Sequence, residues 1–283
     1  MTLNKALYLA TEILDAASID DAHTEAEVLL CHILGISKAQ LYSQPERMLT
    51  QAEIKSLQQL AQRRSLHEPV AYILKHCEFY GIDFYLDHRT FIPRPETELV
   101  VEKIIEFAQQ SFPSGNFTIA DIGTGSGAIA ISLALALPKA KVYAMDISAL
   151  ALQVADINCD YHKLDGQVEL LQGDLLEPLP QTVDVMAANL PYIKDCELFA
   201  LSPEIIDFEP MIALAGGKDG LDRIRSLLAQ IPRKIKPKGC LFMEIGQGED
   251  KAVISLINSC FPQASLELIP DLSKINRVVK VIL

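Results

Sequence analysis

The segment DIGTGSGAIA (Asp121–Ala130) follows the apolar residues FTIA and leads into a second apolar run. Glycines at 123, 125 and 127 allow the chain to turn tightly from a strand into a helix, and they let a ligand approach the backbone. A turn that only reverses the chain needs one or two glycines, whereas three alternate here. The spacing differs by one residue from the G-x-G-x-x-G dinucleotide fingerprint. The segment therefore predicts a strand, a ligand-binding loop and a helix.

The alternation of strand and helix continues from this segment to the end of the chain. The strand KVYAMDI (141–147) precedes the helix SALALQVADINCDYH (148–162), and QVELLQG (167–173) precedes a further helix expected at DLLEPL (174–179). Later strands are expected at VDVMAANL (183–190) and GCLFMEIG (239–246), and SLELIP with NRVVKVIL could close the sheet as a hairpin. This alternation is typical of an α/β fold: a doubly wound, mostly parallel, seven-stranded Rossmann-like sheet with helices on both faces.

A change of pattern divides the chain near residue 76. Before this point apolar residues recur at intervals of three and four, which predicts amphipathic helices, and Thr50 with Glu53 forms a capping box. From Cys77 onward, aromatic and polar residues alternate around Gly81, which predicts two short strands. We therefore expect a helical bundle at 1–76, a β-hairpin connector at 77–93 and the α/β domain at 94–283.

Composition limits the class of protein and its partners. Hydrophobic residues make up 49% of the 283 residues, so the chain can build a sizeable core. The net charge of −12, with no basic face in the sequence, argues against direct nucleic-acid binding, because such proteins gain affinity by neutralising phosphates. No apolar run approaches the ~20 residues that span a bilayer. Six scattered cysteines without a CxxC pair predict reduced thiols and no metal site. We expect a cytoplasmic monomer.

Two acidic residues at strand ends indicate what the glycine turn binds. Asp146 ends the strand after the turn, where a carboxylate can accept hydrogen bonds from both hydroxyls of an adenosine ribose. Ser148 can cap the next helix, which leaves Asp146 for the ligand. Asp174 follows the third strand and could either cap the helix at 174–179 or bind the adenine amino group. Adenosine is part of both NAD and S-adenosylmethionine.

The segment AANLPYI (Ala187–Ile193) distinguishes between these two cofactors. It follows the fourth strand, and open α/β sheets place their reaction site at the carboxyl ends of strands. The Asn189 side-chain oxygen and the Leu190 carbonyl are acceptors, and Pro191 helps to fix the direction of the chain. Two fixed acceptors can hold both hydrogens of a planar NH2 group while the Tyr192 ring covers the attached π-system. This arrangement suits methyl transfer to an amino or amide nitrogen without a metal.

AANLPYI resembles the N-P-P-Y motif of methyltransferases that modify amino or amide nitrogens. Together with PVAYILKHCEFYGIDFYLDHRTFIPRPETELVVE (69–102), DIGTGSGAIAISLA (121–134) and ALAGGKDGLDRIR (213–225), it resembles the release factor glutamine methyltransferase family over nearly the whole chain. The resemblance implies transfer of a methyl group from S-adenosylmethionine to the side-chain nitrogen N5 of a glutamine, with S-adenosylhomocysteine as product. The target implied is the Gly-Gly-Gln motif of peptide chain release factors, which act in translation termination.

The resemblance also implies roles for individual residues. The cofactor would be bound by Gly123, Thr124, Gly125, Ser126, Gly127, Asp146, Asp174, Leu175 and Asn189. The substrate glutamine would be held by the catalytic residues Asn189, Leu190, Pro191 and Tyr192. We expect the helical residues 1–76 to recognise the protein substrate, because the α/β domain already holds what methyl transfer requires. Three residues depart from the family pattern: Leu190 replaces the first proline of the motif, Lys75 replaces a glycine, and Leu175 replaces an aromatic residue found in some relatives.

Other functions remain open at this point. A sister family methylates a glutamine of a ribosomal protein, but it typically has RSP where this chain has RPET (Arg94–Thr97), which favours release factors. An adenine-N6 methyltransferase of DNA or RNA could hold a base amino group with the same four residues, but the acidity of the chain opposes it. A catalytically silent cofactor-binding scaffold is the third alternative, and the intact Asn189 and Tyr192 argue against it.

Overall fold

The computed structural model describes residues 1–283, which form two compact units. The smaller unit contains residues 1–76 together with 202–208, and the larger contains residues 77–201 and 209–283. Each unit has its own hydrophobic core. No helix of the chain is both long enough and apolar enough to cross a membrane.

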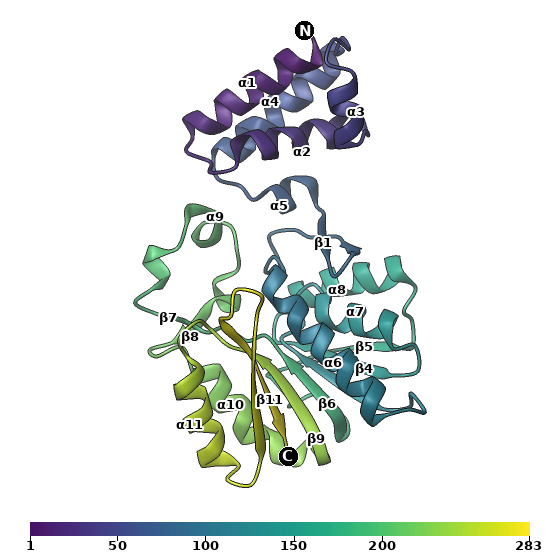
Figure 1. Ribbon diagram of the computed structural model, residues 1–283, viewed down its shortest axis with the longest axis vertical. Coiled ribbons are helices and arrows are strands. Elements are labelled where there is room, and N and C mark those ends of the chain that lie inside the picture. Colours follow the sequence, from purple (N-terminus) through teal and green to yellow (C-terminus); the bar gives the residue numbers. More distant parts are fainter. The chain divides into compact units, whose positions relative to one another are not determined.

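The smaller unit is a bundle of helices, of which those in residues 1–76 are coloured purple to blue in Figure 1, whereas α9 (Pro203–Ile206) is green. Its helices are α1 (Leu3–Ala16), α2 (Ala22–Leu34), α3 (Lys38–Ser43), α4 (Gln51–Ser65), α5 (Val70–Leu74) and, from the later segment, α9. The capping box predicted at the start of α4 is present, because Thr50 and Glu53 each accept a backbone hydrogen bond from the other. Buried Arg64 pairs with both Glu25 and Glu204, which ties the later segment to the bundle. No sequence pattern predicted this contact.

The larger unit begins with a hairpin of two short strands. β1 (Cys77–Phe79) and β2 (Ile82–Phe84) pair antiparallel around a turn that contains Gly81. The next elements are η1 (Pro95–Thr97) and α6 (Glu98–Ser111). Phe79 and Phe84 are buried in the same apolar cluster as α6, so the hairpin packs into the core of the larger unit.

A seven-stranded sheet forms the centre of the larger unit, in the order β10-β11-β9-β6-β3-β4-β5. The strands are β3 (Thr118–Ile122), β4 (Lys141–Asp146), β5 (Val168–Gln172), β6 (Val183–Ala188), β9 (Ile235–Glu244), β10 (Ser265–Pro270) and β11 (Asn276–Ile282). Every neighbouring pair from β9 to β5 is parallel, whereas β11 is antiparallel to both β9 and β10. The doubly wound α/β fold and the terminal hairpin predicted from the sequence are confirmed.

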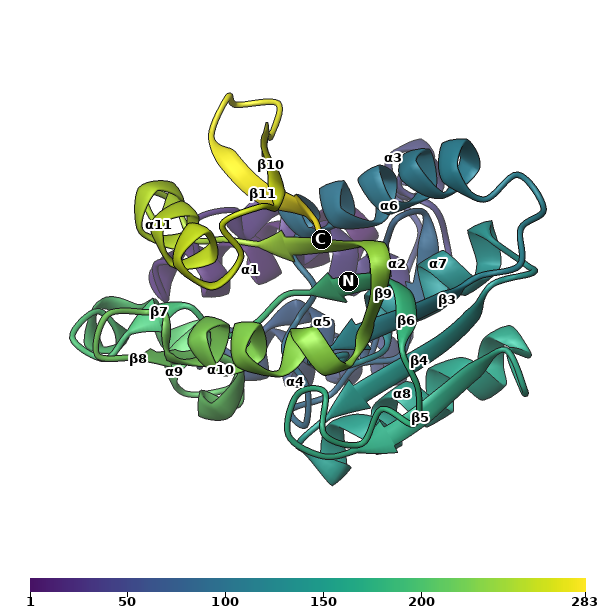
Figure 2. The same cartoon turned by 90° about the horizontal axis from the view of Figure 1, so that it is seen from below.

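Helices cover both faces of this sheet (Figure 2). On one face α6, α7 (Ala128–Ala136) and α8 (Ala149–His162) pack over a cluster that includes Ile119 and Phe242. On the other face α10 (Asp222–Gln230) and α11 (Asp250–Cys260) pack over Ile122 and Leu241. Because successive strand residues point to opposite faces, strands covered on both sides are apolar at nearly every position.

One predicted helix is wrong. After β5, residues 173–178 form bends and turns, and no helix is present at 174–179. The segment is short, it contains Pro178, and Leu175 adopts a positive φ of 53° that no helical residue has. Its leucines are instead buried against the sheet. Short elements that the sequence did not predict follow β6, namely β7 (Ile193–Lys194), η2 (Leu198–Ala200), η3 (Met211–Ala213), β8 (Ala215–Gly217) and η4 (Ile231–Arg233).

The strand order explains where a ligand can enter. From β3 the chain passes to β4 and β5 on one side of the sheet, and then returns to β6 on the other side. Open α/β sheets bind ligands outside the carboxyl ends of the strands where the order reverses. In this sheet that position lies between the ends of β3 and β6, which lead into the two segments singled out from the sequence.

Candidate active site

A pocket of about 320 Å³ opens at this edge of the sheet and is formed by the larger unit. Its volume is within the range of small-molecule sites. Two segments contribute to its wall: the glycine loop (residues 123–127) and the acceptor loop (residues 189–192). The pocket brings together ten predicted site residues: Gly123, Thr124, Gly125, Ser126, Asp146, Leu175, Asn189, Leu190, Pro191 and Tyr192. Gly127 and Asp174 do not line it.

The glycines of the glycine loop serve different purposes. Gly125 has a φ of 57°, and a Cβ there would meet no atom within 4 Å, so its backbone faces open space in the pocket. Gly127 has a φ of 85°, and a Cβ there would lie 2.9 Å from Ile131 of α7. Gly125 therefore lets a ligand approach, whereas Gly127 permits the turn into α7.

A buried carboxyl group lies beneath the glycine loop. Asp121 Oδ2 accepts hydrogen bonds from Thr124 Oγ1 (2.6 Å) and from the Ala130 nitrogen (3.2 Å), while Oδ1 has no partner. Burial raises the pKa of Asp121 to about 7, although both hydrogen bonds act in the opposite direction. Through these hydrogen bonds Asp121 fixes the shape of the glycine loop. The sequence interpretation passed over it, although an acidic residue directly before the glycines was a usable signal.

Asp146 connects the glycine loop to the end of β4. Its Oδ2 accepts from the Gly125 nitrogen (2.9 Å) and its Oδ1 accepts from the Ser148 nitrogen (2.8 Å). Burial raises the pKa of Asp146. Each carboxylate oxygen retains acceptor capacity, so two ligand hydroxyls could be bound as well. Ser148 caps α8 through its own hydroxyl, as the sequence predicted.

The segment after β5 places its two candidate residues differently. Leu175 is buried and lines the pocket. The Asp174 carboxylate forms an ion pair with Arg223, which itself lines the pocket. Because no helix follows β5, the interpretation of Asp174 as a helix cap is wrong. Its contact with an adenine ring stays a prediction.

The acceptor loop presents two oxygens that the protein does not use. Asn189 Nδ2 donates a hydrogen bond to Thr97 Oγ1 (3.0 Å), and no protein group donates to its Oδ1. The Leu190 carbonyl also accepts no hydrogen bond. The Leu190 side chain is buried beside the glycine loop, where a Cβ on Gly123 would lie 3.3 Å from it. Leucine in place of the usual proline therefore fills a space against the glycine loop.

Tyr192 is held by close backbone packing from two other segments. A Cβ on Gly216 would lie 2.7 Å from Tyr192 Cα, and one on Gly246 would lie 3.1 Å from the tyrosine ring. The next residue is fixed by a hydrogen bond from the Ile193 nitrogen to the Leu214 carbonyl (3.1 Å), where β7 pairs with β8. Burial raises the pKa of Tyr192, so its phenol remains neutral at physiological pH. The segment ALAGGKDGLDRIR thus fixes the position of Tyr192, through the close packing of Gly216 and the hydrogen bond to Leu214.

Two buried polar residues, Thr97 and Glu244, connect Asn189 with Tyr192, the first and last residues of the acceptor loop. Thr97 Oγ1 donates to Glu244 Oε2 at 2.6 Å, and the Tyr192 hydroxyl lies 3.4 Å from Glu244 Oε1. Burial raises the pKa of Glu244 to about 7, while the bond from Thr97 acts to lower it. The sequence interpretation assigned no role to either residue. Thr97 lay in the quoted segment RPET and Glu244 in GCLFMEIG, but no sequence signal joined them to Asn189.

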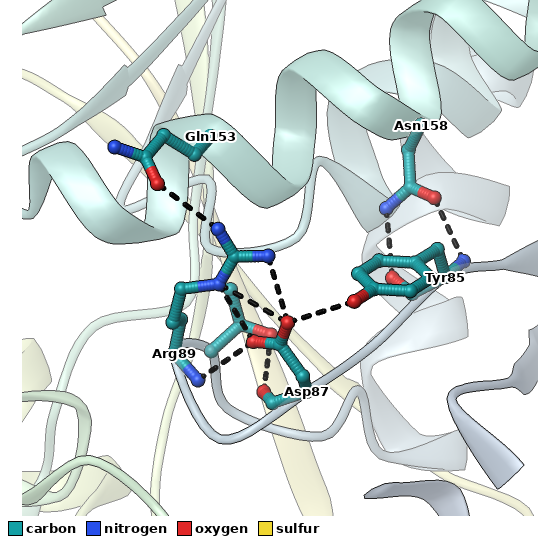
Figure 3. A network of polar contacts seen from close by, with 6 residues as sticks. Tyr85, Asp87, Arg89, Gln153 and Asn158 are labelled. Carbon is teal, nitrogen blue, oxygen red and sulfur yellow. Dashed lines mark hydrogen bonds and ion pairs between the residues drawn. The ribbon is translucent and has the colours of Figure 1, made fainter.

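A polar network holds another part of the pocket wall (Figure 3). Asn158 of α8 donates to the carbonyls of Tyr85 and Ser126, and its Oδ1 accepts from the Tyr85 nitrogen (2.7 Å). Arg89 lines the pocket and pairs with Asp87. Burial opposes ionisation of Asp87, but hydrogen bonds from Arg89 outweigh it and lower the pKa of Asp87 to about 2. The network thereby ties the segment after the hairpin to the glycine loop.

The fold and the site define an α/β methyltransferase. A family model described as a methyltransferase domain matches residues 113–266. The crystal structure of a methyltransferase from Pyrococcus furiosus has the same fold, with a TM-score of 0.53 and 18% identity over 78% of this chain and 96% of that chain. A second family model, described as the PrmC N-terminal domain, matches residues 5–74.

Curated relatives identify the family. A release factor glutamine methyltransferase of Koribacter versatilis is 38% identical over 281 residues, which cover 99% of this chain and 98% of the relative. One of Moorella thermoacetica is 40% identical over 272 residues, which cover 96% and 95%. The chain belongs to the release factor glutamine methyltransferase family, and it is an enzyme. The family resemblance seen in the sequence is confirmed.

Proposed function

We propose that the protein methylates the side-chain nitrogen N5 of the glutamine in the Gly-Gly-Gln motif of peptide chain release factors, in translation termination. The observation that carries this proposal is the pair of unused acceptors, Asn189 Oδ1 and the Leu190 carbonyl, beside Tyr192. A primary amide has two N–H donors in one plane, which match two fixed acceptors. The names of the full-length relatives support release factors as the protein that carries this amide.

The residues around the glycine loop fit S-adenosylmethionine as the cofactor. Asp146 can accept the ribose hydroxyls, the open space at Gly125 admits the ligand to the backbone, and Leu175 offers an apolar surface for the adenine. When bound, the sulfonium of this cofactor supplies the methyl group, and S-adenosylhomocysteine is the product. Asp146 is held in place before any ligand arrives, because both of its oxygens already accept backbone hydrogen bonds.

The acceptor loop has to make an amide nitrogen reactive. The lone pair of an amide nitrogen is shared with its carbonyl, so attack requires the nitrogen to turn partly out of conjugation. Asn189 and the Leu190 carbonyl would hold both N–H groups and would accept more strongly as positive charge develops on the nitrogen. This stabilisation grows toward the transition state. After the nitrogen has gained the methyl group, it would release one of its two protons to water, which leaves a neutral N-methyl amide. Tyr192 would cover the amide plane and exclude water.

The smaller unit is proposed to recognise the folded substrate. The pocket with its acceptors belongs to the larger unit, so residues 1–76 are available to add a second binding surface. A whole release factor should then bind more tightly than a short peptide with the same Gly-Gly-Gln motif. We expect a lower KM for the protein than for the peptide at similar kcat. Equal KM values would argue against a recognition role for the smaller unit.

Isotope transfer tests the reaction directly. Purified protein is incubated with methyl-labelled S-adenosylmethionine and a release factor, and the product is mapped by peptide mass spectrometry. We expect one methyl group on the glutamine of Gly-Gly-Gln and none on a release factor whose motif is Gly-Gly-Ala. Methylation of a ribosomal protein or of DNA in preference to the release factor would overturn the proposal.

A further inference from the structure

We propose that Glu244 and Thr97 form a hydrogen-bond relay that fixes which way the Asn189 amide points, which makes them positioning residues for methyl transfer. This inference rests on the proposed function, because it concerns the oxygen that would hold the substrate amide. The relay runs from Glu244 Oε2 to Thr97 Oγ1 (2.6 Å) and from there to Asn189 Nδ2 (3.0 Å).

The sheet and the start of α6 bring the three residues together. β6 and β9 are parallel neighbours in which Ala188 pairs with Met243. Asn189 and Glu244 are each one residue further along, so both lie at the carboxyl edge of the sheet. Thr97 is the last residue of η1 and lies between their side chains, where it is buried like Glu244. Thr97 and Asn189 both line the pocket, and of these two Asn189 has an oxygen to which no protein group donates.

The direction of the relay follows from counting hydrogens. The Thr97 hydroxyl has a single hydrogen, and an ionised Glu244 carboxylate can only accept. The hydrogen therefore points to Glu244, and only a lone pair of Thr97 is left for Asn189. Asn189 must turn its NH2 group toward Thr97, so its oxygen faces the pocket. Without the relay, either end of the Asn189 amide could face the substrate.

A protonated Glu244 would remove this constraint. A neutral carboxylic acid can donate to Thr97, and the Thr97 hydrogen is then free to point to the oxygen of Asn189. Asn189 would present its NH2 group to the NH2 group of the substrate, and two donors cannot bond. Ionised Glu244 also adds a negative charge to the site. Thr97 and Asn189 lie between this charge and the substrate nitrogen on which positive charge develops. The productive state of the relay is therefore the ionised one.

The surroundings of Glu244 make its ionisation sensitive to neutral pH. Burial raises its pKa to about 7, Thr97 and Arg277 act to lower it, and Glu96 acts to raise it. The Tyr192 hydroxyl is the remaining polar contact, and its own raised pKa keeps it neutral. We therefore expect kcat to increase as the pH rises through about 7.

The first test removes the hydroxyl of Thr97 without changing its shape. Thr97→Val should lower kcat by about 10–100-fold, which is the loss seen when a hydrogen-bond partner that orients a metal ligand is removed in other enzymes. The KM for S-adenosylmethionine should change little, and Thr97→Ser should restore most of the rate. Thr118→Val is the matched control, because it removes a hydroxyl bonded to Asp184 (2.8 Å) at the opposite end of β3 and β6. This control should retain parental kcat.

The second test examines the charge. The Glu244→Gln side chain can turn either an oxygen or an NH2 group toward Thr97, so it no longer dictates the direction of the relay. We expect a lower kcat and no rise in kcat near pH 7. Asp121 and Asp146 also have raised pKa values near the pocket, but they are unchanged in this variant. If the rise in kcat near pH 7 is absent in Glu244→Gln, the group whose ionisation causes that rise is therefore Glu244.

A spectroscopic measurement separates this inference from the proposed function. In protein with 15N-labelled asparagine, the Asn189 side-chain signals are identified by their loss in Asn189→Ala. Thr97→Val should shift them and speed their hydrogen exchange, whereas Thr118→Val should not. No substrate is needed for this measurement. Unchanged signals together with a parental kcat in Thr97→Val would overturn the relay. A parental enzyme that leaves release factors unmethylated, with the signals shifted as expected, would overturn the proposed substrate alone.

Discussion

The glycine loop and the acceptor loop each have a buried carboxyl group behind them, and the two carboxyls differ in where their partners lie in the chain. Asp121 accepts a hydrogen bond from Thr124, three residues later, and from the backbone of Ala130, nine residues later. Glu244 accepts from Thr97, 147 residues earlier, and lies close to the hydroxyl of Tyr192, 52 residues earlier. Both hydrogen bonds from threonine are 2.6 Å long, and burial raises the pKa of both carboxyls to about 7.

The two carboxyl groups therefore support the pocket in different ways, one through local contacts and the other through contacts between distant segments. Asp121 shapes a loop that local sequence already defines, because its partners are within one strand, loop and helix. Glu244 assembles a surface from three separate segments, so its role exists only after the sheet has formed. We expect the glycine loop to control cofactor affinity and the acceptor loop to control turnover. Four measurements test this difference between the two loops.

The largest effect is expected from Asn189→Ala in the acceptor loop. The variant loses one of the two acceptors that would hold the substrate amide, so kcat should fall by on the order of 10²–10³, as when one preorganised polar group is removed from a transition-state site. Calorimetry should show a smaller loss of cofactor affinity than Asp146→Ala causes. A parental kcat at saturating substrate would mean that Asn189 of the acceptor loop does not hold the substrate amide during methyl transfer.

Asp146→Ala tests the other side of the pocket. The loss of a charged acceptor for the ribose should weaken S-adenosylmethionine binding by roughly 1.5–3 kcal/mol, and saturating cofactor should restore much of the turnover. NAD should not bind to the parental protein. Asp184→Ala, at the far end of β6, is the control and should leave the affinity unchanged. An unchanged affinity in Asp146→Ala would remove this residue from the cofactor site.

The two buried carboxyls should make the protein less stable as the pH rises from about 4.5 to 7. Each keeps its proton in the folded state over this window but loses it in the unfolded chain, so folding takes up protons. Each group can reduce the free energy of unfolding by up to about 1.4 kcal/mol per pH unit. Urea unfolding at pH 5 and pH 7 should show a smaller loss in Asp121→Asn and in Glu244→Gln. Variants with the parental pH dependence would show that these groups ionise normally.

The smallest effect is expected from Leu190→Pro, which restores the N-P-P-Y motif. The Leu190 nitrogen donates no hydrogen bond, and its carbonyl is kept in the variant, so kcat should stay within a few-fold of the parental value. The variant loses apolar packing against the glycine loop, which should reduce stability by about 1 kcal/mol. Calorimetric unfolding and a turnover assay check both expectations. A large loss of kcat would mean that Leu190 acts through more than its carbonyl.

The order of the seven sheet strands along the chain, the glycine loop, the position of Asp146 at the end of β4 and the acceptor loop after β6 could be read from the sequence. These features depend on periodicity and on residues close together in the chain, where local geometry decides the structure. The helix expected at 174–179 was wrong because Leu175 adopts a positive φ of 53° and Pro178 would fall inside the helix, while the leucines of the segment are buried against the sheet.

The contacts that hold the acceptor loop could not be read from the sequence. Thr97, Glu244 and the glycines around Tyr192 come from segments far apart in sequence, and the register of β6 with β9 brings two of these segments to one edge. The same is true of Arg64, a basic residue of the amphipathic helix α4 that is buried and pairs with Glu204 in the smaller unit. The hydrogen bonds of a buried polar group depend on what packs around it, and that packing is set by the whole sheet and bundle rather than by neighbouring residues.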